Sequence, residues 1–77
     1  EDGSKKTLGV MQIGKYEFNT QVKEIIEITS GEMKVLLPNE TIWKDLKGGM
    51  TFEAPANSSF KLEVYQIINF CCSYIEE

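Results

Sequence analysis

Short runs in which apolar and polar residues alternate dominate this sequence, and they restrict the chain to an all-β fold. In the run YEFNT at 16–20, Tyr16, Phe18 and Thr20 fall on one face of a strand and polar residues occupy the other. The run FKLEV at 60–64 alternates in the same way. No stretch has the spacing of an amphipathic helix longer than about two turns. The pattern therefore predicts strands that each bury one face.

Turn-forming residues divide the chain into about eight such strands. The expected strands are 8–13, 16–20, 24–29, 33–37, 41–46, 50–54, 60–64 and 67–75. Gly, Pro, Asn and Ser gather between them, and we expect a hairpin at 30–32. About eight short antiparallel strands predict a small antiparallel β-barrel or jelly roll.

Length and composition limit the partners and the location of the protein. Its 77 residues suit a single domain, 1–77, in which 1–7 is expected to be a flexible or partial N-terminal segment. A core this small favours a homodimer. The net charge of −4, with no Arg and no Lys cluster, argues against nucleic acid, and no apolar run approaches the ~20 residues of a membrane span. The adjacent Cys71 and Cys72 suit a reducing cytoplasm.

Glu24 stands out because it falls in phase with apolar residues. It precedes Ile26 and Ile28 on the face that we expect to be buried. Charged side chains are rarely buried without a partner. The residues alone leave two interpretations open, a carboxylate that reaches solvent at the strand end and a carboxylate that serves a functional site.

The residues around Glu24 resemble the first motif of the cupin superfamily, in which two histidines and a glutamate hold a metal inside a small barrel. Phe18 and Thr20 fall at the two histidine positions, Glu24 at the glutamate and Gly31 at the closing glycine. A second cupin motif matches less fully and has Phe60 at its histidine. The resemblance implies a cupin barrel of about eight strands without the metal site, and therefore no metal cofactor.

A narrower set of motifs resembles the short bacterial pyrimidine/purine nucleoside phosphorylases. The matching segments are GVM at 9–11, YEF at 16–18, SG at 30–31, VLLP at 35–38, Trp43, G-x-x-F-x-x-P at 49–55 and the run ending at Phe60. The resemblance extends from Gly9 to Tyr74. It implies a broad-specificity enzyme that cleaves nucleosides to a free base and ribose 1-phosphate, with inorganic phosphate as co-substrate.

Four side chains are candidates for binding and cleaving a nucleoside. Tyr16, Phe18 and Phe60 offer flat apolar walls on which a purine or a pyrimidine would stack. Glu24 is the candidate catalytic residue, because an ionised carboxylate can bind ribose hydroxyls and stabilise positive charge at the anomeric carbon. For the aromatic residues, packing in the barrel core is the interpretation that the residues alone favour.

Thr20 and Ser58 are further substrate-binding candidates, as hydroxyl donors near the expected barrel mouth. The chain lacks Arg and has Ser73 where some members of that family carry Arg. A Lys, a backbone amide nest or a neighbouring subunit must therefore bind phosphate. Three functions therefore stay open: a nucleoside phosphorylase, a non-catalytic barrel that binds a sugar- or nucleoside-like ligand, and a structural dimer with a packed interior. A cavity of roughly 300 Å³ beside Glu24 would favour the first two.

Overall fold

The computed structural model describes residues 5–75 and forms a single antiparallel sheet from six strands in that range. The strands are β1 (Lys5–Met11), β2 (Gly14–Asn19), β3 (Lys23–Leu36), β4 (Lys44–Lys47), β5 (Thr51–Ala54) and β6 (Ser59–Ile75). The described residues contain no helix, and so none that could span a membrane. The all-β prediction is confirmed.

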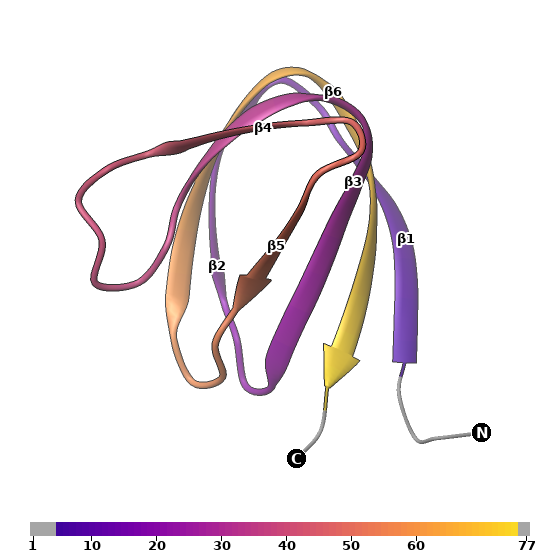
Figure 1. Cartoon of the computed structure of the whole chain (residues 1–77). Coiled ribbons are helices and arrows are strands. Elements are labelled where there is room, and N and C mark those ends of the chain that lie inside the picture. The colour runs from indigo at the N-terminus through magenta and orange to yellow at the C-terminus, as the bar shows by residue number, and fades with distance from the viewer. Residues whose placement is uncertain (1–4, 76–77) are drawn as a thin grey trace.

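The two long strands, β3 and β6, build both layers of the fold. The first part of β3 pairs with the last part of β6, and β5 and β1 flank this pair. The last part of β3 pairs with the first part of β6, and β4 and β2 flank that pair. Both long strands bend midway, so the sheet folds over on itself (Figure 1). The result is the small barrel expected from the sequence, although no ladder closes it within residues 5–75.

The structure has six strands instead of the expected eight, because two pairs of predicted strands are continuous. The hairpin predicted at 30–32 is wrong, since β3 continues through it. Gly31 adopts a φ of +102°, and the register between β3 and β6 shifts around it, which identifies a β-bulge. The predicted strands 60–64 and 67–75 are likewise one strand, β6, and Gln66 lies opposite Glu32 at the bend. A bulge bends a paired strand, whereas a hairpin would have reversed it.

The N-terminal strand also begins earlier than expected. Within the segment 1–7, Lys5, Lys6 and Thr7 pair with the end of β6 and belong to β1. Residues 1–4 lie outside the described part of the chain. The last three residues of the segment 1–7 are therefore part of the sheet, because β6 offers them a partner that is distant in sequence.

The hydrophobic core lies between the two layers. It draws buried apolar side chains from five of the six strands, and β2 adds Tyr16 at its edge. Ile28, Met33, Val35 and Ile68 are fully buried at the bend. The buried members of the core are Met11, Ile26, Ile28, Met33, Val35, Leu46, Phe52, Ala54, Phe60, Leu62, Val64, Ile68 and Cys72. This core fills the bend of the barrel and leaves its other end less tightly packed.

Candidate functional site

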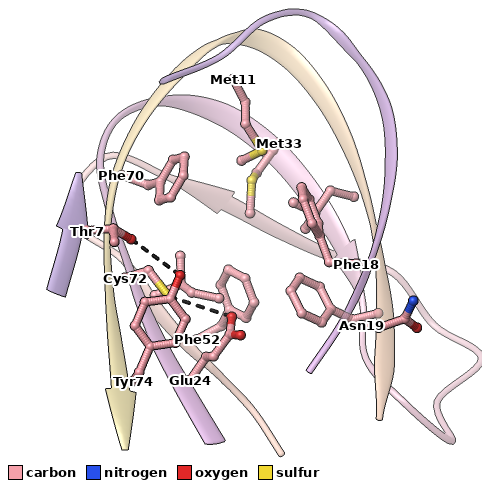
Figure 2. Close-up of a pocket in the computed structure, with 13 residues that line it drawn as sticks. Thr7, Met11, Phe18, Asn19, Glu24, Met33, Phe52, Phe70, Cys72 and Tyr74 are labelled. Carbon is pink, nitrogen blue, oxygen red and sulfur yellow. Dashed lines mark hydrogen bonds between the residues drawn. The ribbon is translucent and has the colours of Figure 1, made fainter. Parts of the chain in front are cut away.

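A cavity of about 280 Å³ opens between the two layers beside Glu24 (Figure 2). Five strands supply its lining, which consists of Thr7, Met11, Phe18, Asn19, Glu24, Ile26, Met33, Phe52, Phe60, Leu62, Phe70, Cys72 and Tyr74. Its volume is close to the roughly 300 Å³ at which small-molecule pockets begin. The interior is therefore not filled by side chains, which argues against a purely structural role.

Polar side chains gather at one end of this cavity (Figure 2). Glu24 on β3 and Tyr74 on β6 are partners in the sheet register, and so are Thr7 on β1 and Cys72 on β6. The hydroxyl oxygens of Thr7 and Tyr74 lie 3.4 Å apart. The Cys72 thiol donates a hydrogen bond to Glu24 Oε1, with a sulfur-to-oxygen distance of 3.6 Å. The polar end thus combines a carboxylate with three neutral hydrogen-bonding groups.

The Cys72 thiol acts here as a hydrogen-bond donor. Burial, and after it the nearby charge of Glu24, raise its pKa from 9.0 to about 11, although a hydrogen bond from Tyr74 acts in the opposite direction. The thiol therefore keeps its proton at neutral pH and is a poor nucleophile. The Cys72 side chain is buried in the hydrophobic core. Its contact with Glu24 was not predicted.

Aromatic rings form one wall of the cavity. The ring centroids of Phe18 and Phe60 are 5.7 Å apart with the planes tilted by 33°, and those of Phe52 and Phe60 are 5.8 Å apart and nearly perpendicular. Phe18 is 39% exposed, so its ring is open to a ligand, whereas Phe52 and Phe60 are buried. Phe70 lies on the opposite side of the cavity (Figure 2). The cavity therefore presents carbon surfaces on both sides and hydrogen-bonding groups at one end.

Three of the six predicted site residues line the cavity, namely Glu24, Phe18 and Phe60. Tyr16 does not: its ring stacks on Phe18, with centroids 6.0 Å apart, and its hydroxyl donates to the carbonyl of Gln12 at 2.6 Å. It supports the aromatic wall from behind instead of contributing to the surface of the cavity.

Thr20 and Ser58 also lie outside the cavity lining. The Thr20 hydroxyl donates to the carbonyl of Pro55 at 2.6 Å and accepts a hydrogen bond from the backbone N–H of Ser58 at 3.1 Å. The Ser58 hydroxyl donates to the same Pro55 carbonyl at 2.6 Å. These bonds fasten the end of β2 to the loop before β6. Both hydroxyls therefore have structural partners, and the structure does not bring them into the lining of the cavity.

Sequence reasoning did not place Thr7, Tyr74 and Cys72 together beside Glu24 at the polar end of the cavity. Thr7 is in phase with Met11 on β1, and Tyr74 is in phase with Cys72 on β6, so the period-two pattern was the available signal. That pattern alone cannot place β1 beside the end of β6, because the pairing joins residues 67 positions apart in the sequence.

A cupin-type metal site does not fit the residues that surround this cavity. Within the described chain, no group of three or more His, Cys, Asp or Glu residues is placed to hold a metal ion. Glu24 and Cys72 are the two side chains of these types in the lining. Phe18 and Phe60 put carbon into the lining at two of the motif's histidine positions, and Thr20 occupies the third.

Solved structures of other proteins define the class to which this fold belongs. A crystal structure of a cupin superfamily protein from Desulfitobacterium hafniense matches with a TM-score of 0.81 over 100% of this chain and 71% of the other, at 13% identity. A protein of unknown function from Acinetobacter sp. ADP1 matches with a TM-score of 0.89 and 38% identity, over 99% of this chain and 73% of the other. The chain has the cupin fold.

The family within that class follows from sequence comparison. A profile of the family described as pyrimidine/purine nucleoside phosphorylase matches residues 1–74. Relatives of that name from Leptospira interrogans and Wolinella succinogenes are 51% and 53% identical to it. The alignments cover 99% and 96% of this chain and 72% and 70% of the relatives. The chain belongs to the pyrimidine/purine nucleoside phosphorylase family, which confirms the resemblance seen in its motifs.

Proposed function

We propose that this protein is a nucleoside phosphorylase and that the cavity beside Glu24 is its active site. In this reaction the N-glycosidic bond breaks, a phosphate oxygen bonds to the anomeric carbon, and the base leaves with a proton. The products are a free purine or pyrimidine base and ribose 1-phosphate. The observation that carries the proposal is a carboxylate at the polar end of an aromatic-lined cavity, in a chain that belongs to this family.

The aromatic wall suits a nucleobase of either kind. Phe18 is open to the cavity and packs against the buried Phe60, which in turn packs against the buried Phe52. Stacking of a base on an aromatic side chain contributes about 1–3 kcal/mol and does not depend on which base is stacked. Few polar groups line this wall, so the site has little means of distinguishing a purine from a pyrimidine. We therefore expect both to be substrates.

Glu24 suits the ribose and the charge that develops on it. An ionised carboxylate accepts hydrogen bonds from ribose hydroxyls, and it attracts the positive charge that forms at the anomeric carbon as the base departs. At a separation of about 4 Å and an effective dielectric constant of about 20, this attraction amounts to about 4 kcal/mol. That energy corresponds to about a thousand-fold in rate. The hydrogen bond from Cys72 holds the carboxylate in place for this role.

The test compares two Glu→Gln substitutions on β3. Glu24→Gln should lower the rate of phosphate-dependent base release by about 100- to 1,000-fold, because it removes the charge and keeps the shape. Glu27→Gln is the matched control, since Glu27 is exposed and does not line the cavity. The assay measures free base and ribose 1-phosphate from a panel of nucleosides with and without inorganic phosphate. Equal activity in the two variants would refute the role of Glu24.

A second function has one observation in its favour. The chain contains no Arg, so it lacks the side chain that binds phosphate with two parallel hydrogen bonds. A barrel that binds a sugar- or nucleoside-like ligand without turnover needs no phosphate site. Nucleoside binding by a folded sample, without phosphate-dependent release of base from any nucleoside, would establish this alternative.

The proposal also includes a metal-free mechanism, a cytoplasmic location and a homodimer. A metal-free mechanism follows from the carbon side chains at the motif's histidine positions. A cytoplasmic location suits the two free cysteines, Cys71 and Cys72. A homodimer suits an outer face on which Leu8, Val10 and Ile67 are all more than half exposed. Sedimentation equilibrium tests the last point, and a mass of one 8.8 kDa chain would contradict it.

A further inference from the structure

The polar hydrogens at the polar end of the cavity are already donated to partners within the protein. The Cys72 thiol donates its hydrogen to Glu24 Oε1, at a sulfur-to-oxygen distance of 3.6 Å. The Tyr74 hydroxyl forms a hydrogen bond with Cys72 that lowers the pKa of the thiol, so Tyr74 is the donor in that bond. A hydroxyl has a single hydrogen to donate. Thr7 is therefore the donor in the 3.4 Å contact between its hydroxyl and that of Tyr74.

This end of the cavity consequently offers a ligand acceptor oxygens. A carboxylate has two oxygens with about four lone-pair sites and no hydrogen. The Cys72 thiol occupies one of those sites, on Oε1 of Glu24. Glu24 is half-buried and lines the cavity, so its remaining lone pairs are within reach of a bound molecule. A ligand at this end must bring its own hydrogens.

The charge of Glu24 gives the polar end a negative potential. After burial, this charge is the next cause that raises the pKa of the Cys72 thiol. Among the described residues, Glu24 is the one Asp, Glu, Lys or Arg side chain in the cavity lining. A charge acts more strongly in a partly desolvated cavity than in water, because the effective dielectric constant is lower there. The potential therefore favours a positive group and disfavours an anion.

The aromatic rings of the cavity favour the same sign of charge. The face of an aromatic ring is partially negative, and it attracts a cation that lies within about 6 Å of its centre. Phe52 and Phe60 lie on one side of the cavity and Phe70 on the other (Figure 2). Tyr74 lines the cavity as the register partner of Glu24. A positive group at the polar end would meet a carboxylate within a cavity that is lined by aromatic rings.

We propose that the polar end of the cavity is a subsite for a positively charged, hydroxylated group, such as a protonated five-membered ring amine that carries hydroxyls. Its N–H and O–H groups supply hydrogens to Glu24, and its charge faces the carboxylate. The inference rests on the proposed function for the shape of this ligand, because a ribose ring gains positive charge as the base departs. A site complementary to that state binds a stable cation of the same shape more tightly than the neutral sugar.

The test measures binding to the full chain at neutral pH, without turnover. One probe is a pyrrolidine that carries the hydroxyl groups of ribose and is protonated, and the other is the neutral tetrahydrofuran of the same shape. In calorimetric titrations the pyrrolidine should bind the wild type about 10- to 100-fold more tightly, the gain expected for charged hydrogen bonds. Glu24→Gln should lose this preference, whereas Glu24→Asp and the control Glu27→Gln should keep it. Inorganic phosphate should not displace the pyrrolidine.

The outcomes separate this inference from the proposed function. A preference for the cation that Glu24→Gln removes supports the subsite even if no nucleoside is cleaved, in which case only the proposed function fails. The inference alone is overturned if nucleosides are cleaved while the wild type binds the two probes equally. It is also overturned if a folded Glu24→Gln variant keeps the preference, or if phosphate competes with the pyrrolidine.

Discussion

Alkaline pH should destabilise this protein through the Cys72 thiol. Burial and the charge of Glu24 raise the pKa of the thiol from 9.0 to about 11 in the folded protein. Between these two values the unfolded chain loses the proton while the folded chain keeps it. The unfolded state therefore binds fewer protons, and the free energy of unfolding falls as the pH rises. The contribution of this group is complete below about pH 9 and is lost by about pH 11.

The size of the effect follows from the shift. Each unit of pKa corresponds to 1.36 kcal/mol, so a shift of about two units gives at most about 2.7 kcal/mol. The Cys72 side chain is only 4% exposed, yet it borders a cavity that water can enter, and hydration of the thiolate would reduce the loss. We therefore expect a decrease of between about 1 and 2.7 kcal/mol.

Urea unfolding of the wild type and of Cys72→Ser, measured under reducing conditions from about pH 8 to about pH 11, isolates this contribution. Serine keeps a donor for Glu24 and does not titrate in this range. The two proteins differ at this one side chain, so the difference between the two curves reports the loss of the Cys72 thiol. Cys71→Ser is the control for the adjacent thiol. A difference that stays constant within about 0.5 kcal/mol over this range would refute the reasoning.

Two further predictions concern the bulge and the metal. In urea unfolding, Gly31→Ala should destabilise the fold by more than about 3 kcal/mol and Gly49→Ala by about 1–2 kcal/mol. Both glycines have a positive φ, but only at Gly31 would a Cβ collide with the Ile67 carbonyl oxygen. Equal losses of stability in the two variants would contradict this reasoning. Elemental analysis should find no stoichiometric transition metal, and chelators should leave activity unchanged; one zinc, iron or manganese ion per chain would exclude the metal-free mechanism.

The fold class and half of the proposed site could be predicted from alternation alone. Strands that bury one face keep a strict period of two, and that period placed Glu24, Phe18 and Phe60 on the inner side of the barrel, where the structure has them. A carboxylate in phase with Ile26 and Ile28 is unusual for a packed core. The same local property that defines the strand therefore also marks the candidate site.

The parts that could not be predicted depend on pairing between distant segments. Ser30, Gly31 and Glu32 have the composition of a turn, but β6 pairs with β3 on both sides of them and turns the expected hairpin into a bulge. The sequence also does not reveal that the Thr20 hydroxyl accepts a hydrogen bond from the backbone N–H of Ser58, a contact between residues 38 positions apart. In each case the sequence shows the chemical character of the residue but not the distant segment with which it interacts.

The cupin motifs locate the cavity but not its polar end. Two of the positions that carry histidine in those motifs, Phe18 and Phe60, form the aromatic wall in this chain. The hydrogen-bonding groups other than Glu24 gather where β1 meets the end of β6, at Thr7 and Tyr74. A metal held by the motif residues would sit against the wall that we assign to the base. The polar side chains of this cavity lie instead on the side of Glu24 that faces β1, and no histidine position of the motif contributes to them.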